Sequence, residues 1–160
     1  IYLIGECKND MASSEYIVHH HKIDLSPAPH FELKEEAQVQ DAVAKLIENK
    51  LVLSAHDLSE GGLFIAVLES AMINNFGFEI TTCASIRRDA CLFGEGQSRV
   101  VVSVAAAAKD SFENFLKANQ IPNRFLGTVR GTDITIDNEN FGTISEYKEL
   151  YDTAIEKYFV

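Results

Sequence analysis

The most constraining feature of the sequence is an almost uniformly apolar segment, residues 63–73, which directly follows Gly61 and Gly62. A helix that is apolar on nearly every face is stable only in a protein interior, so this segment predicts a central buried helix. The apolar residues 51–53 predict a short buried strand before it. A strand, a glycine turn and a helix in this order present free backbone N–H groups that suit an anion such as a phosphate. A tight turn that binds nothing is the alternative.

The residues around this turn are the first candidate ligands. Gly61 and Gly62 would let a ligand approach the backbone closely. The hydroxyl of Ser59 could donate to a phosphate or cap the helix. Asp57 could bind a magnesium ion or cap the same helix. His56 could support the site as a general base, but no nucleophile for it is visible in the sequence, and a hydrogen-bonded structural histidine is the alternative.

A second glycine-containing segment, residues 93–99, precedes a valine-rich strand. Its glycines permit an unusual backbone around Glu95, and Arg99 is a plausible partner for a phosphate or a carboxylate. An ion pair between Glu95 and Arg99 is the structural alternative. The sequence contains no Walker A or GxGxxG motif. We therefore predict ligand binding by Ser59, Gly61, Gly62 and Arg99, and we predict no catalytic residue.

Composition narrows the classes of partner. The 160 residues carry 14 Lys and Arg against 24 Asp and Glu, for a net charge of −10, with no basic stripe. Nucleic acid is therefore an unsuitable partner. No segment has the length and hydropathy of a membrane span. The three cysteines contain no CxxC pair, which argues against a zinc cluster. Their odd number argues against a disulfide framework and favours reduced thiols in the cytoplasm.

Periodicity and turn signals predict an α+β fold with a mixed β-sheet layered with helices. We expect a helix over residues 31–50, with a core stripe of Val39, Val43, Leu46 and Ile47. We expect a hairpin formed by residues 125–129 and 134–136. The other expected elements are strands over residues 1–4, 78–81 and 99–104, a short helix capped by Ser13 or Ser14, a helix over residues 109–119, and a Tyr-rich helical stripe from Tyr147 to Tyr158.

Four segments resemble signatures of the phosphoribosylformylglycinamidine synthase family. Residues 56–62 resemble the family's HDxSEGG motif, and residues 92–104 resemble its second signature. Its GGSEY segment resembles residues 14–16, although Ala12 and Ser13 stand where glycines are usual, and its IGxV strand resembles residues 126–129. These segments occur in family order and span most of the chain, so their combination is specific.

The resemblance implies the C-terminal domain of the second repeat of the large synthetase subunit. Residues 1–160 would form one domain similar to the C-terminal domain of aminoimidazole ribonucleotide synthetase, with residues 1–30 as an inter-domain segment. The chain would be a piece of a longer polypeptide.

The activity implied by the resemblance is ATP-dependent C–N ligation, with ATP and Mg²⁺ as cofactors. The complete enzyme would convert formylglycinamide ribonucleotide and glutamine-derived ammonia into formylglycinamidine ribonucleotide. This domain would supply one wall of a composite cleft beside upstream domains, with a glutaminase subunit or domain as a further partner. The domain alone would be inactive.

Two alternatives remain open at the level of the sequence. One is a domain of a related ATP-dependent kinase, although the HDLSEGG and FGEGQSR strings favour the synthetase. The other is a non-catalytic interaction domain. The sequence also leaves open whether the glycine turn serves a catalytic or an auxiliary nucleotide cleft.

Overall fold

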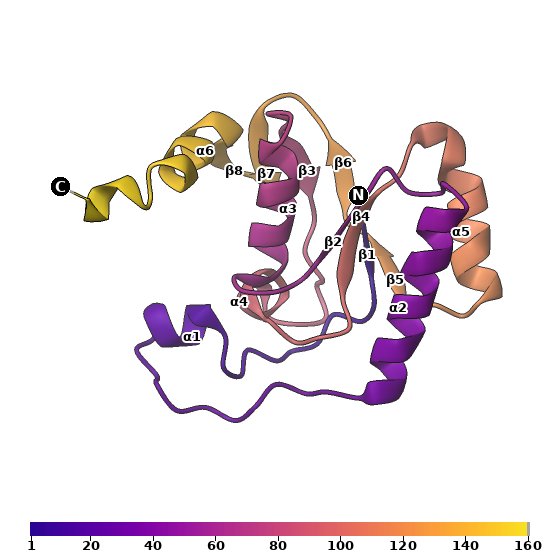
Figure 1. The fold of residues 1–160 in the computed structure, drawn as a ribbon, viewed down its shortest axis with the longest axis horizontal. Coiled ribbons are helices and arrows are strands. Elements are labelled where there is room, and N and C mark those ends of the chain that lie inside the picture. The colour runs from indigo at the N-terminus through magenta and orange to yellow at the C-terminus, as the bar shows by residue number, and fades with distance from the viewer. Residues whose placement is uncertain (160) are drawn as a thin grey trace.

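The computed structural model describes residues 1–159, which form two four-stranded β-sheets with helices on and between them (Figure 1). All neighbouring strands of the first sheet are antiparallel, and Tyr2 in its interior pairs with Val102 on one side and Phe125 on the other. The order of strands in this sheet is β2 (Ser54–Asp57), β4 (Val100–Ser103), β1 (Tyr2–Ile4) and β5 (Asn123–Phe125).

The second sheet is mixed, because one of its strand pairs is parallel and the others are antiparallel. The parallel pair is β3 with β7, where Phe78 lies opposite Ile134. The α+β class and the mixed sheet predicted from the sequence are confirmed. The order of strands is β6 (Gly127–Val129), β3 (Phe78–Ile80), β7 (Asp133–Ile136) and β8 (Glu139–Thr143).

Two hydrophobic clusters hold these layers together. The helices α2 (Leu33–Glu48) and α5 (Lys109–Ala118) cover one face of the first sheet and pack on Tyr2 and Ile4. The helix α3 (Gly62–Met72) is buried in the other cluster with Leu3 and with Phe78 of the second sheet. Because successive strand residues point to opposite faces, β1 contributes to both clusters.

The remaining helices are short or lie at the edge. They are α1 (Glu15–His19), α4 (Arg88–Phe93), α6 (Ile144–Asp152) and two 3₁₀ turns, Ala106–Ala108 and Glu156–Tyr158. Ser14 is the N-cap of α1, as expected, and its side chain accepts a hydrogen bond from the backbone of Ile17. None of the helices in residues 1–159 is long and apolar enough to cross a membrane.

The strand before the glycine turn lies later than predicted. Residues 51–53 are not part of it, and Leu53 is 74% exposed, whereas Ser54–Asp57 form β2. β2 is the edge strand of its sheet and pairs only with β4, so it does not need a buried apolar run. His56 and Asp57 consequently lie within a strand rather than in the loop after it.

The hairpin predicted from residues 125–129 and 134–136 is wrong. β6 and β7 lie on opposite sides of β3, and Phe125 belongs to the other sheet. The hairpin of this region is formed by β7 and β8, through Asp137 and Asn138, which both have positive φ angles. Positive φ at both central residues is the requirement of a type I′ turn, and Asp and Asn tolerate it better than most residues.

The core stripe of α2 is mostly as predicted. Val39 and Leu46 are buried and Val43 is partly buried, but Ile47 is 53% exposed. At the C-terminus, Tyr147 packs on the core, whereas Tyr158 is 87% exposed.

Candidate functional site

The turn between β2 and α3 is closed by its own backbone. The N–H of Gly62 donates to the carbonyl of Ser59 at 3.0 Å, and the buried Leu58 donates to the carbonyl of Arg99 at 3.0 Å. Gly61 and Gly62 have φ angles of 81° and 65°, a left-handed backbone that favours glycine. The turn is therefore fixed against the strand β4 and against the start of α3.

A carboxylate already occupies the N–H group that we expected to bind a phosphate. One carboxylate oxygen of Glu95 accepts hydrogen bonds from the N–H of Gly61 and from the N–H of Glu15, both at 2.8 Å. Glu95 thereby joins the N-terminal ends of α1 and α3, where unpaired donors would otherwise remain. The sequence signal for this contact is an acidic residue between two glycines, but it does not identify the partner.

Arg99 shapes the loop that carries Glu95. The Arg99 side chain is only 4% exposed, and it donates to the carbonyl of Gly94 at 2.7 Å and to the carbonyl of Gly96 at 2.9 Å. Burial lowers the pKa of the guanidinium, while the negative charges of Asp10 and Glu95 act in the opposite direction. Within residues 1–159, Glu95 and Arg99 form no ion pair of the kind considered from the sequence.

The missing side chain of Gly62 makes room for protein backbone. A Cβ atom at this position would lie 2.6 Å from the carbonyl oxygen of Gly94 and 2.9 Å from that of Leu92. The end of α4 thus packs directly on the start of α3. At Gly62, the close approach expected of a ligand is made by the chain itself.

The side chains of His56 and Asp57 differ in the contacts that they make. The Nδ1 atom of His56 donates to the carbonyl of Asp57 at 2.7 Å, and its Nε2 atom lies 3.2 Å from a carboxylate oxygen of Glu69. The exposed Asp57 and Ser59 do not cap α3, because the N-cap residue is Gly61. The capping alternatives for these two residues are therefore wrong.

These segments surround a surface pocket of about 530 Å³. Its charge is mostly negative, and the Ser98 hydroxyl donates to Glu36 at 2.7 Å across one side. Among the described residues, no three His, Cys, Asp or Glu side chains are arranged to hold a metal ion. The polar and charged residues that line the pocket are Glu36, Gln40, Asp57, Ser59, Glu60, Glu95, Gln97, Ser98 and Arg99.

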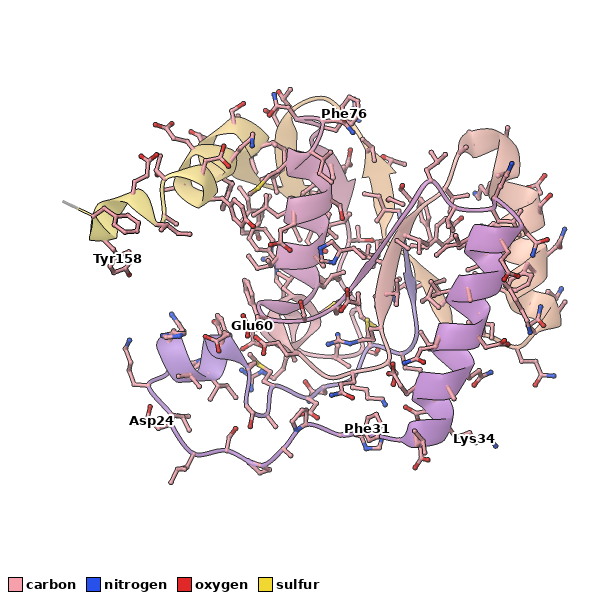
Figure 2. The ribbon with its side chains drawn as sticks, in the orientation of Figure 1. Asp24, Phe31, Lys34, Glu60, Phe76 and Tyr158 are labelled. Atoms are coloured by element: carbon pink, nitrogen blue, oxygen red, sulfur yellow. The ribbon has the colours of Figure 1, made fainter. Side chains whose placement is uncertain are left out.

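The pocket lies at one end of α3. Figure 2 shows Glu60 next to the start of this helix, on the side of the molecule where α1 lies, and Phe76 beyond the other end. The structure therefore brings Asp57, Ser59, Gly61, Gly62, Glu95 and Arg99 into one region, although the two segments are far apart in the sequence. The side chain of His56 is not part of this pocket, because it lines a different groove and lies beside Glu69.

Comparison with sequence families places the chain in a known group. Residues 1–137 match the model of the C-terminal domain of AIR synthase related proteins. The chain is 34% identical to phosphoribosylformylglycinamidine synthase subunit PurL of Alkaliphilus metalliredigens over 160 residues, which is 98% of this chain and 22% of that protein. It is 36% identical to the PurL subunit of Caldanaerobacter subterraneus over 86% of this chain and 19% of that protein. The chain thus spans about a fifth of these curated relatives.

Comparison with solved structures shows the same fold. A structure described as T. maritima PurL complexed with FGAR matches 92% of this chain and 27% of that one, with a TM-score of 0.73 and 14% identity. Thiamine-monophosphate kinase from Stenotrophomonas maltophilia matches 86% of this chain and 49% of that one, with a TM-score of 0.56 and 16% identity.

Proposed function

The chain belongs to the AIR synthase related protein family, whose C-terminal domain its sequence matches, and on this basis we propose that it works in a phosphoribosylformylglycinamidine synthase. The proposed reaction joins formylglycinamide ribonucleotide and glutamine-derived ammonia at the expense of ATP. The observation that carries this proposal is the 34% identity to a PurL subunit over 98% of the chain. The meeting of residues 57–60 with residues 95–99 at one pocket, and the hydrogen bond from Gly61 to Glu95, support it.

We propose that the pocket faces a phosphate group in the complete enzyme. Ser59 is exposed at its rim, and Arg99 lines it and uses two of its three nitrogen atoms within the 94–99 loop. The N–H of Gly61 would become available if the Glu95 carboxylate moved away. Gly62 acts in this proposal through the shape of the turn, since its Cβ position is filled by backbone.

We propose that this chain supplies only some of the ligands of a magnesium ion. The side-chain carboxylates of Asp57 and Glu60 line the pocket and make no hydrogen bond to other described residues, so they supply the hard oxygen atoms that Mg²⁺ prefers. The described residues assemble no complete metal site. The other ligands would come from upstream domains, and the isolated chain would neither hydrolyse ATP nor form product.

The upstream domains are proposed to cover an apolar groove toward the other end of α3. This groove has a volume of about 850 Å³ and lies between the first sheet and α3. Leu53 and Ile73 at its rim are 74% and 80% exposed, and Phe76 projects beside them (Figure 2). Exposed apolar patches of this kind mark interaction surfaces. A glutaminase partner is proposed from the relatives, since a structure described as PurLQS from Thermotoga maritima shares the fold.

The proposed reaction is tested on the purified full-length protein. We expect formylglycinamidine ribonucleotide from formylglycinamide ribonucleotide, ATP, Mg²⁺ and ammonium. Phosphorylation of thiamine monophosphate in place of this reaction would identify the related kinase instead. A lack of both activities, with a correctly folded protein, would favour the interaction domain.

The proposed site is tested by a matched pair of serine variants. Ser59→Ala should raise the KM of a phosphate-bearing substrate about tenfold, because a lost hydrogen bond to a charged group is worth about 1.5 kcal/mol or more. Ser111→Ala is the control, since Ser111 is also exposed but lies on α5 and does not line the pocket. Equal kinetics for the two variants would contradict the site while leaving the reaction assignment intact.

A further inference from the structure

The three cysteines come from separate parts of the chain and meet in one cluster. Cys7 follows β1, Cys83 lies between β3 and α4, and Cys91 lies within α4. Cys91 is completely buried, whereas Cys7 and Cys83 are partly exposed. The N–H of Cys83 donates to the sulfur of Cys91 at 3.4 Å, and Cys7 packs against the hydrophobic cluster that contains Cys91. We refer to these three side chains as the thiol cluster.

Cys83 is the accessible thiol of the cluster with a cation beside it. Nη1 of Arg124 donates to the sulfur of Cys83 at 3.4 Å, and Nη2 donates to the carbonyl of Thr82 at 2.9 Å. Within residues 1–159, no carboxylate lies within ion-pair distance of Arg124. The hydroxyl of Ser85 lies 3.0 Å from the same sulfur. These donors are placed to stabilise a thiolate at Cys83.

The neighbouring groups give the three thiols different acidities. The hydrogen bonds from Ser85, together with the charge of Arg124, lower the pKa of Cys83. The interaction with Cys7, together with the N–H of Cys83 and the charges of Arg124 and Arg99, lowers the pKa of Cys91. The same interaction, together with burial, raises the pKa of Cys7.

We propose that the thiol cluster is a peroxide-reactive site, in which Cys83 is oxidised first and Cys91 then closes a reversible disulfide with it. The oxidant is a hydroperoxide such as H₂O₂. Cys83 is accessible and lies against Arg124, and the sulfur of Cys91 is held beside the Cys83 backbone. Cys7 packs against the same cluster as Cys91 and is assigned a positioning role.

The chemistry balances in two steps. In the first, the thiolate of Cys83 attacks one peroxide oxygen, an S–O bond forms, and the O–O bond breaks. The leaving hydroxide takes up the proton that the thiol released, so the products are a sulfenic acid and water. In the second, the thiolate of Cys91 attacks the sulfur of Cys83, the S–S bond forms, and the S–O bond breaks. The second hydroxide also leaves as water after protonation.

The cluster lies directly behind the candidate site. Cys91 is in the helix that leads into the loop from Gly94 to Arg99, and the charge of Arg99 acts on both Cys7 and Cys91. Disulfide formation consumes the negative charge of Cys91 and leaves the buried Arg99 without it. The modification is therefore placed to alter the loop that carries Glu95.

The sequence makes the test direct, because Arg87 and Arg88 separate Cys83 from Cys91 and allow trypsin to place them in different peptides. The purified full-length protein is treated with H₂O₂, blocked with N-ethylmaleimide, digested and analysed by mass spectrometry. We expect a peptide pair linked through Cys83 and Cys91 that dithiothreitol separates. A link between Cys7 and Cys91, or oxidation of Cys83 no faster than that of free glutathione, would overturn the proposal.

Single substitutions separate the roles. Cys91→Ser should leave a sulfenic acid on Cys83 that dimedone traps, whereas the protein with Cys91 intact should give little adduct. Cys83→Ser should abolish the linked pair. Equal dimedone labelling of Cys83 with and without Cys91 would show that Cys91 does not act on it.

The role of Cys7 is tested by the rate at which the linked pair forms and by the pH midpoint of that rate. A purely structural role would not move the midpoint. Cys7→Ala should slow formation of the linked pair several-fold at pH 7 and move its pH midpoint upward, because the interaction that favours the Cys91 thiolate is gone. Cys7→Ser supplies an O–H group at this position and should recover much of the rate. A similar rate and midpoint in all three proteins would remove Cys7 from the proposal.

Discussion

The carboxylate of Glu95 lies on the backbone N–H of Gly61, with 2.8 Å between oxygen and nitrogen, and the same oxygen accepts from Glu15 at 2.8 Å. Two helix starts are thus tied to one side chain, which comes from the loop after α4. The contact therefore stabilises both helix starts. It also controls whether the N–H of Gly61 is free to bind the phosphate that we propose.

Replacing Glu95 by alanine is therefore expected to destabilise the chain by about 1–3 kcal/mol, since two backbone donors lose their partner. Glu95→Gln should cost less, because the amide oxygen can accept the same bonds. Urea unfolding followed by circular dichroism measures both, which suits a chain without tryptophan. Equal stability of the alanine variant and the unchanged protein would show that the contact is not formed in solution.

Glycine substitutions distinguish backbone strain from steric overlap. Gly62→Ala forces a left-handed φ of 65° and places a Cβ atom 2.6 Å from the carbonyl oxygen of Gly94. Gly131→Ala is the control, because it has a φ of 57° and nothing within 4 Å of its Cβ position. The control should lose about 1–2 kcal/mol and Gly62→Ala a further 1–3 kcal/mol, roughly. Similar losses would mean that α4 does not pack on α3 as described.

Local signals in the sequence were sufficient for most helices and for the central strands. The apolar residues 63–73 predict α3, and the valines of residues 100–102 predict β4, because burial dictates both patterns. β2 could not be predicted in this way. It is a polar edge strand, and its pairing with β4 depends on a partner that lies distant in the sequence.

The hairpin error has the same origin. Two strand-like runs with a glycine turn between them are compatible with direct pairing, but β3 lies between them in the sheet. No local pattern contains that information. The turn at Asp137 and Asn138 does carry a local signal, since Asp-Asn tolerates positive φ, and it could have identified the β7–β8 hairpin.

The candidate site shows the same division between features that local sequence indicates and contacts that distant segments decide. The sequence predicted that the glycine turn and Arg99 serve one ligand region, and in the structure Ser59 and Arg99 line the same pocket. It did not identify the partners of Gly61 and His56, which are Glu95 and Glu69. Contacts between distant segments decide which backbone donors remain free, and periodicity says nothing about them.

The burial of α3 gives a prediction that depends on packing alone. Leu68 is 4% exposed in the larger hydrophobic cluster, so Leu68→Ala should cost about 2–5 kcal/mol through the lost contacts and the remaining cavity. Leu53→Ala removes the same atoms from a side chain that is 74% exposed, and it should change stability by less than about 0.5 kcal/mol. A loss below 1 kcal/mol for Leu68→Ala in urea unfolding would place α3 at the periphery.

The last prediction concerns pH and the segment before α2. The carboxylate of Asp10 accepts the N–H of Ala12 at 2.9 Å and the N–H of His30 at 2.8 Å, which ties two distant parts of the segment together. Burial raises the pKa of Asp10, but these two hydrogen bonds outweigh it, and the pKa lies below its usual value of 3.8.

A carboxylate whose pKa is lower in the folded state stabilises the fold fully above its unfolded value and loses this effect as pH falls through the folded value. Asp10→Asn should therefore lower the free energy of unfolding by about 1 kcal/mol at pH 7, a modest value because the group is only partly buried. The difference between the two proteins should stay constant down to about pH 5 and shrink below pH 3.8. Urea unfolding at a series of pH values measures it. A difference that grew towards low pH would show the opposite linkage and would mean that the folded state favours the protonated acid.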